Sequence, residues 1–273
     1  MKKLLCAFLV VTLFAGLACA ESVKVGLLSK LNVSQEEFNK FVKEQRDSGK
    51  SSLFSAGGEA EKSYVYYDSL MSLIMAVNAG EVNEILLPED VAEYVLNIND
   101  SYKVSRILRG PQMYLSFGFR KDDDPALRRK FNEALMSMQA DGTLAILQAK
   151  YIDEPGIGEP ASVEFGRYEN EKETVRVAVT GDMPPIDYVN TAGTPAGFNT
   201  AVLAEIAKLL KINIELVNID SGARAAALAS GRVDLVFWFE AVTGESVQVD
   251  IPESITLSEP YYYWNEFLFL SKK

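Results

Sequence analysis

The stretch Ala223–Trp238, with the sequence ARAAALASGRVDLVFW, has the pattern of a helix that ends at a glycine and is followed by a buried strand. Gly231 suits the left-handed position that commonly ends a helix, and the apolar run after it has the length of a strand. Ser69–Leu87 has the same pattern, with Gly80 at the end of its helical run. Both stretches share the spacing Ala-x-x-x-Gly-x-Val, so the sequence predicts an internal repeat.

Strand and helix patterns also surround both copies of this unit. Apolar side chains alternate in Val23–Leu27, and a helix signalled by a capping box at Ser34 follows. In the second half, the strand pattern Val175–Val179 precedes a helical apolar face within Val202–Leu210, and Ile212–Leu216 alternates as the next strand. Strands that alternate with helices form largely parallel sheets with covered faces, so the predicted fold class is α/β.

The first twenty residues have the pattern of a secretory leader. Met1–Lys3 is a positive n-region, Leu4–Leu17 is a short apolar stretch, and Ala18–Ala20 is an A-x-A cleavage site. Cleavage there predicts a periplasmic chain with no membrane span. Lipidation of Cys19 is the alternative, although a lipidation signal needs a bulky aliphatic residue at the position that Gly16 occupies.

The two halves are separated by a segment with the composition of a linker, rich in proline and glycine and then in mixed charges. The chain without its leader, about 250 residues, suits one large domain or two of moderate size. The predicted organisation is a leader at 1–20, a lobe at 21–116, a crossover strand and helices packing on the other lobe at 117–151, a linker at 152–174 and a second lobe at 175–273.

The composition argues against several classes of protein. Leader cleavage removes Cys6 and Cys19, which are the two cysteines, and the whole chain has no histidine. Nucleophilic triads that depend on histidine and most zinc sites are therefore excluded, and we predict no catalytic residue, metal or cofactor. Cleavage also removes two lysines and no acidic residue, so the net charge of −11 becomes −13. Such a chain repels nucleic acid and anionic lipid.

Residues 175–273 resemble the first lobe of the amino-acid-type periplasmic substrate-binding proteins of ABC transporters. The resemblance lies in four stretches: Gly181–Tyr188 (GDMPPIDY), Gly193–Asn199 (GTPAGFN), Leu228–Leu235 (LASGRVDL) and Ser258–Tyr262 (SEPYY).

Residues 23–151 resemble the remainder of the same family, which normally follows that lobe. The matching stretches are Lys24–Leu27, Asn78–Asn83, Phe117–Lys121, Asn132–Leu135, Ala140–Leu144 and Lys150–Tyr151. The resemblance therefore implies a two-lobed type II periplasmic binding protein fold that is circularly permuted. In that fold, Ser116–Lys121 is the continuous crossover between lobes, and Asn265–Leu270 pairs with it as a second strand. Two degenerate family members fused in tandem are the alternative.

The resemblance also implies a ligand held in the cleft between the lobes. The family's carboxylate-binding arginine falls near Ser246, yet Val236–Gln248 contains no basic residue. The family's ammonium-binding aspartate position holds Pro88, and the usual stacking position holds Ile186. A bidentate arginine–carboxylate pair is strong and geometrically demanding, so its loss predicts a small polar or cationic ligand instead of a standard amino acid.

Nine residues are the candidate ligand contacts: Trp238, Glu240, Tyr188, Asp182, Phe239, Thr243, Ser29, Ser34 and Glu89. Core packing is the alternative for Trp238, a solvated loop is the alternative for Glu240, and helix or loop capping is the alternative for Asp182 and Ser34. Packing near the hinge is the interpretation for Tyr261–Trp264.

These patterns predict an exported, monomeric solute-binding protein that closes over its ligand and delivers it to an ABC transporter permease. Two other classes stay open. One is a carboxylate-dependent dehydratase on the same fold, using Glu240, Asp182 and Glu89. The other is a sensory or partner-binding protein that has lost transport.

Overall fold

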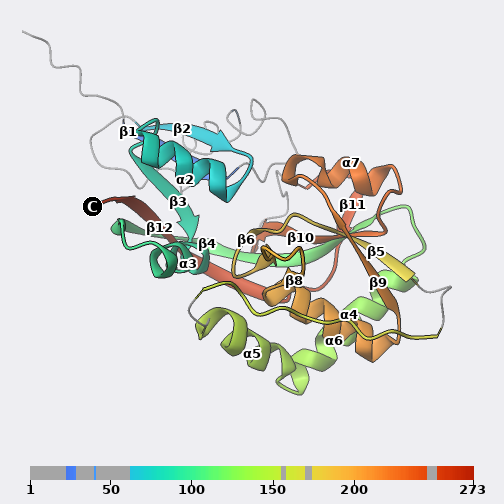
Figure 1. The fold of residues 1–273 in the computed structure, drawn as a ribbon. Coiled ribbons are helices and arrows are strands. Elements are labelled where there is room, and N and C mark those ends of the chain that lie inside the picture. Colours follow the sequence, from blue (N-terminus) through green and yellow to red (C-terminus); the bar gives the residue numbers. More distant parts are fainter. Residues whose placement is uncertain (1–22, 29–39, 41–61, 155–157, 170–173, 245–250) are drawn as a thin grey trace, which may run out of the picture.

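The computed structural model describes residues 23–28, 40, 62–154, 158–169, 174–244 and 251–273. The predicted leader and the candidate residues Ser29 and Ser34 lie outside this range. The described chain forms a mixed α/β structure around one nine-stranded sheet, with a small three-stranded sheet beside it (Figure 1). The α/β class is therefore confirmed.

The elements follow one another in the order β1 (Val23–Leu28), β2 (Lys62–Tyr67), α2 (Leu70–Ala79), β3 (Glu84–Pro88), α3 (Glu89–Ile98), β4 (Tyr102–Arg120), α4 (Ala126–Ala140), α5 (Thr143–Gln148), a π-helical turn (Ala149–Asp153), β5 (Thr174–Val179), β6 (Asp182–Met183), β7 (Asp187–Val189), β8 (Pro195–Ala196), α6 (Phe198–Leu210), β9 (Asn213–Asn218), a 3₁₀ turn (Ser221–Ala223), α7 (Arg224–Ala229), β10 (Leu235–Val242), β11 (Ile255–Leu257) and β12 (Tyr262–Lys272).

The main sheet consists of two halves with the same strand order. In the first half the order is β2-β1-β3-β12-β4, with β1 parallel to β2 and β3, and with β12 antiparallel to both β3 and β4. In the second half the order is β9-β5-β10-β4-β11, with β5 parallel to β9 and β10, and with β4 antiparallel to β10 and β11. Each half of the sheet thus contains one strand from the other half of the sequence: β12 lies in the first half of the sheet, and β4 lies in the second.

The strands β4 and β12 connect the two halves. They pair antiparallel from Tyr102 opposite Lys272 to Leu115 opposite Tyr262, and Figure 1 shows them running together through the middle of the molecule. Both are longer than the sequence predicted, because β4 starts well before Ser116 and β12 starts before Asn265. The strands β12 and β4 do pair, but the predicted register is wrong. Phe267–Leu270 lies opposite the segment from Leu108 back to Val104, while Ser116–Arg120 pairs with β10 and β11, because β4 continues far beyond the predicted crossover in both directions.

The predicted helix–glycine–strand repeat is present in both halves. Gly80 ends α2 with φ 76°, and Gly231 follows α7 with φ 72°. This left-handed conformation is readily available to glycine and costly for residues with a Cβ atom. The strands that follow, β3 and β10, are buried along nearly all of their length. The local sequence signal therefore corresponds to equivalent positions in the two halves.

The helices α4 and α5 come from the first half of the sequence but pack on α6 of the second half, as predicted. Burial of Val202, Leu203 and Ile206 on α6 matches the predicted apolar face. The prediction that Leu209 belongs to this apolar face is wrong, since Leu209 is 49% exposed. No helix in the described part of the chain is long and apolar enough to cross a membrane.

The described part of the predicted linker, residues 158–169, lies along the second half and is called the strap below. The backbone N–H of Val163 donates to the carbonyl of Pro195 on β8 at 3.1 Å. The Tyr168 backbone exchanges two hydrogen bonds with the Asn213 amide, both 2.9 Å long. Val163 and Phe165 also pack against the core. The strap is therefore bound to the second half through Pro195 of β8 and Asn213 of β9.

Asn213→Ala tests how firmly the strap is held. The substitution removes both hydrogen bonds to Tyr168, and the free energy of unfolding should fall by about 1–3 kcal/mol. Asn213→Asp keeps the acceptor and should lose less. Urea unfolding measures both, with Lys208→Ala as the surface control, since it removes only an exposed pair with Glu205. Equal stability of Asn213→Ala and the control would show that the strap is not held there.

Candidate ligand-binding site between the two halves

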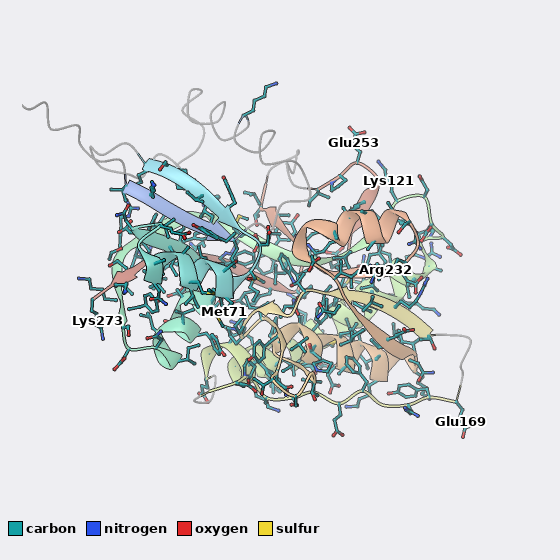
Figure 2. All side chains as sticks on the ribbon, turned by 45° about the horizontal axis from the view of Figure 1, so that its top comes forward. Met71, Lys121, Glu169, Arg232, Glu253 and Lys273 are labelled. Atoms are coloured by element: carbon teal, nitrogen blue, oxygen red, sulfur yellow. The ribbon has the colours of Figure 1, made fainter. Side chains whose placement is uncertain are left out.

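The segments that follow the carboxyl ends of the parallel strands in the two halves meet at one place, which is called the junction below. α3 begins directly after β3, and β6 and β7 follow β5. The Tyr94 ring on α3 lies against the Tyr188 ring on β7, with centroids 6.4 Å apart. α2 contacts β6, and Met71 lies in the first turn of α2 (Figure 2). In open α/β sheets ligands bind beyond the carboxyl ends of the strands, so this junction is the candidate site.

Tyr188 is the predicted contact that the structure places at the junction. Its hydroxyl donates to Oε1 of Glu159 on the strap at 3.1 Å, and Thr191 also donates to Glu159. Burial raises the pKa of Tyr188, and the neighbouring Tyr94 and Glu159 raise it further. The hydroxyl therefore stays protonated and remains a donor. The sequence prediction missed Glu159, because it assigned that residue to a linker.

Asp90 and Tyr262 join α3 to β12 at the same junction. The Tyr262 hydroxyl donates to Oδ2 of Asp90. Burial raises the pKa of Asp90, while this hydrogen bond opposes the rise and the carboxylates of Glu93 and Asp153 add to it. Burial also raises the pKa of Tyr262, and Asp90 raises it further. The carboxyl group of Asp90 is therefore poorly hydrated, and the Tyr262 hydroxyl beside it stays protonated and donates a hydrogen bond to it.

Trp264 lies beside this pair. Its ring stacks on that of Tyr262 with centroids 5.9 Å apart and an interplanar angle of 20°. Only 8% of Trp264 is exposed, and its Nε1 has no hydrogen-bond partner among the described residues. Buried polar groups without partners are rare in folded proteins. The sequence interpretation gave Tyr261–Trp264 a packing role, and no local signal distinguishes this N–H group.

Glu89, the predicted contact on α3, lies on the acidic side of the junction. Burial raises the pKa of Glu89, and Glu266, Glu93 and Asp90 raise it further, while Arg109 opposes them. Arg109 binds Glu266 with Nε 2.7 Å from Oε1. Acidic groups therefore predominate around the start of α3.

Trp238 packs inside the second half, with 1% of its surface exposed. Its Nε1 donates to Oδ2 of Asp187 at 2.8 Å, and its carbonyl accepts from Nη1 of Arg224 at 2.9 Å. The Arg224 guanidinium also lies 4.0 Å from the centre of the Trp238 ring. A ligand could reach this ring only if the surrounding core moved. These contacts favour the packing alternative, and the ligand role of Trp238 stays a prediction.

The other predicted contacts on β10 lie in different surroundings. Phe239 is buried against Gly118 of β4. Glu240 is partly buried opposite Leu115, whose neighbour on the other side is Tyr262. Thr243 is exposed, and its N–H donates to the carbonyl of Gln112. Their ligand role stays a prediction.

Asp182 lies on β6 with its backbone paired to Tyr188, so its backbone is close to the junction. Its side chain lies outside what the structure describes. The described residues also contain no group of three or more histidine, cysteine, aspartate or glutamate side chains arranged to hold a metal ion.

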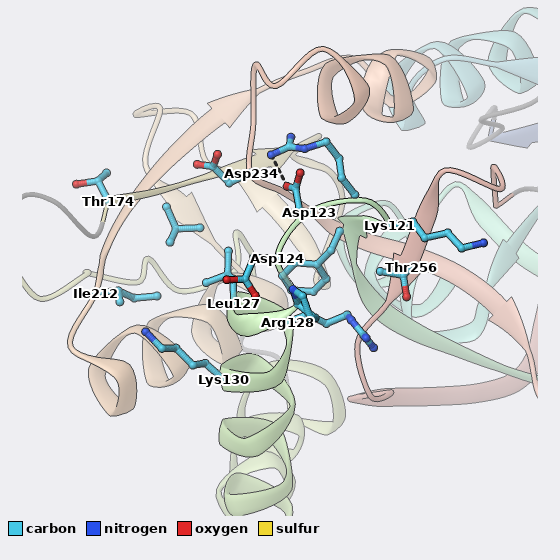
Figure 3. Close-up of a pocket in the computed structure, with 14 residues that line it drawn as sticks. Lys121, Asp123, Asp124, Leu127, Arg128, Lys130, Thr174, Ile212, Asp234 and Thr256 are labelled. Carbon is cyan, nitrogen blue, oxygen red and sulfur yellow. Dashed lines mark ion pairs between the residues drawn. The ribbon is translucent and has the colours of Figure 1, made fainter.

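An open pocket of about 540 Å³ lies at a different place, at the end of β4 and the start of α4 (Figure 3). It reaches Thr174 at the start of β5 and Asp234 just before β10, which are the amino ends of these strands. Arg120 lies 2.7 Å from Asp123 within this lining, and Asp234 binds Arg176, which does not line the pocket. This pocket is therefore separate from the candidate site.

Comparison with known protein families finds a match to one of them. Residues 175–273 match the bacterial extracellular solute-binding proteins, family 3, and this part of the chain carries that family's sequence pattern. The family consists of extracytoplasmic binding proteins. No curated protein matches the chain in sequence.

Several solved structures are similar in fold. One is the ligand-binding component of an ABC-type import system from Staphylococcus aureus with zinc bound, at 12% identity and a TM-score of 0.44, covering 92% of this chain and 66% of that one. Another is the periplasmic aliphatic sulphonate binding protein from Escherichia coli, at 8% identity and a TM-score of 0.42, covering 92% and 65%. A third is a binding protein from A. tumefaciens in complex with agropinic acid, at 13% identity and a TM-score of 0.41, covering 78% and 55%. The chain thus spans less than two thirds of the length of these proteins.

Proposed function

We propose that this protein is an extracytoplasmic solute-binding protein that closes over a small polar or cationic ligand and delivers it to an ABC transporter permease. The observation that carries the proposal is the family match of residues 175–273. It acts as a monomer and catalyses no reaction. The described residues give no support to the dehydratase or to the sensory role.

The arrangement of the two halves supports a ligand site at the junction. Each half has the same strand order, and β4 and β12 connect the two halves. Movement about these two strands separates Tyr94 on one half from Tyr188 on the other, and their return encloses a ligand. The same order in both halves also supports the circular permutation, in which residues 23–151 supply the remainder of the family's fold.

A thermal melt tests the proposed function. A ligand present at one hundred times its dissociation constant stabilises the folded protein by about 2.7 kcal/mol, which a melt detects easily. The co-purifying ligand should be released on denaturation, identified by mass spectrometry, and should raise the melting temperature when added back. The common amino acids should cause little shift, because Val236–Gln248 has no basic residue to bind a carboxylate. A large shift with glutamate would contradict this ligand class.

The intact mass of the same preparation tests export. A chain that begins at Glu21 without a lipid is expected. A diacylglycerol group on Cys19 as the first residue would contradict the predicted cleavage.

A further inference from the structure

We propose that the open pocket at the end of β4 and the start of α4 is a second binding site, which takes a small organic acid with an apolar body and a carboxylate. The pocket lies in the second half, at the amino ends of β5 and β10, and apart from the junction. The inference therefore goes beyond the proposed function and does not depend on it.

The pocket has room for a small molecule, and part of its lining is apolar. Its volume of about 540 Å³ falls within the usual range of small-molecule sites, about 300–1,000 Å³. Phe119, Val175 and Ile212 contribute apolar surface from three different segments of the chain, and Leu127 of α4 adds a less buried side chain. An apolar body placed against these side chains leaves water, and this burial favours binding.

The acidic groups of the lining already have partners. Asp123 pairs with Arg120 at 2.7 Å, and Asp234 pairs with Arg176 at 2.7 Å. Asp124 accepts a hydrogen bond from the first backbone N–H group of α4 at 2.9 Å, where the positive end of the helix dipole balances its charge. The three carboxylates therefore leave the remaining basic groups of the pocket without a counter-charge.

Three basic side chains of the lining have no hydrogen-bond or ion-pair partner among the described residues: Lys121, Arg128 and Lys130. The Nε atom of Arg128 is moreover buried, and a buried donor of this kind is destabilising until an acceptor reaches it. The chain as a whole has a net charge of −11, so this group of unpaired cations is a local exception. A carboxylate supplies both the missing charge and the missing acceptor.

The carboxylate belongs on the side of the pocket that α4 and β11 form. Figure 3 shows Arg128 and Lys121 on this side, together with Thr256 of β11. Thr256 lies opposite Phe119 of β4 in the strand pairing, and its hydroxyl has no partner among the described residues. A guanidinium, an ammonium group and a hydroxyl can thus all donate to one carboxylate. Ile212 lies on the other side of the pocket, so the apolar body extends in that direction (Figure 3).

Titration calorimetry with four matched probes tests the inference, at low and constant ionic strength because salt screens exposed charges. Benzoate carries a ring and a carboxylate, acetate carries only the carboxylate, and benzyl alcohol carries the ring without a charge. Benzylammonium carries the ring with the opposite charge. Benzoate should bind, and each of the other three probes should bind at least about tenfold more weakly, because each lacks either the apolar body or the negative charge.

Variants of α4 locate the site. Arg128→Gln removes the charge and should weaken benzoate by about tenfold or more. Arg128→Lys keeps the charge but loses the planar fork, so it should weaken benzoate by less. Arg129→Gln is the matched control, because Arg129 is the next residue on α4, is exposed and does not line the pocket. It should change the affinity by less than about twofold, and melting curves without ligand check that every variant folds.

Three results would overturn the second site: no binding of benzoate, binding of benzylammonium as tight as that of benzoate, or an equal loss in Arg128→Gln and Arg129→Gln. The ligand that co-purifies with the protein provides a further check. It should bind Arg128→Gln with unchanged affinity, and benzoate should still bind when that ligand saturates the protein. Displacement of one by the other would show that the pocket is not a separate site. Failure to find any co-purifying ligand bears on the proposed function and leaves the benzoate result standing.

Discussion

Deletion of Phe267–Lys273 should abolish the cooperative folding of the first half. These residues form most of β12, which lies between β3 and β4 and pairs with both. Leu268, Phe269 and Leu270 are buried there, and burial of each such side chain contributes about 1.5–3 kcal/mol. Their combined loss approaches the whole stability of a typical domain, about 5–15 kcal/mol.

Urea unfolding followed by circular dichroism measures this effect, and small-angle scattering measures the accompanying expansion. The matched control removes only Lys272 and Lys273, whose side chains are exposed. This shorter deletion should cost far less, because it leaves the buried part of the strand in place. If the longer deletion folded and closed normally, β12 would not be part of the hinge, and the permuted arrangement would be wrong.

Trp238→Ala should lower the free energy of unfolding by about 3–5 kcal/mol, which is the usual cost of removing a large buried aromatic side chain. The cavity would adjoin Arg224, which loses the ring it covers, and Asp187, which loses the indole donor. The effect should therefore be on stability first. A residue that only contacts the ligand, as the sequence predicted for Trp238, would instead change affinity and leave stability unchanged.

Trp238→Phe separates the two contributions to that loss. It retains most of the ring and removes the hydrogen bond to Asp187, so it should cost about 1–3 kcal/mol. Leu209→Ala is the surface control and should change stability by less than about 0.5 kcal/mol. Chemical denaturation provides these values. An alanine variant that is as stable as the unmodified protein but binds no ligand would restore the ligand-platform interpretation of Trp238.

The sequence by itself determined the features that depend on neighbouring residues. The α/β class follows from apolar periodicity, and the repeat follows from Gly80 and Gly231, since a left-handed helix end is a local requirement for glycine. The helical face containing Val202, Leu203 and Ile206 was also predictable from its spacing. The family motifs in residues 175–273 belong to the same class of signal, because they lie within short segments of the chain.

Only the tertiary structure decided the composition of the junction. Tyr262 and Asp90 are 172 positions apart, and the indole of Trp238 reaches Asp187 across 51 positions. Such contacts depend on which strands become neighbours and in which register, and a local pattern contains neither. The burial of Trp238 has the same origin, because an aromatic residue near a strand end has the same sequence pattern whether the neighbouring strands cover it or leave it open to a ligand.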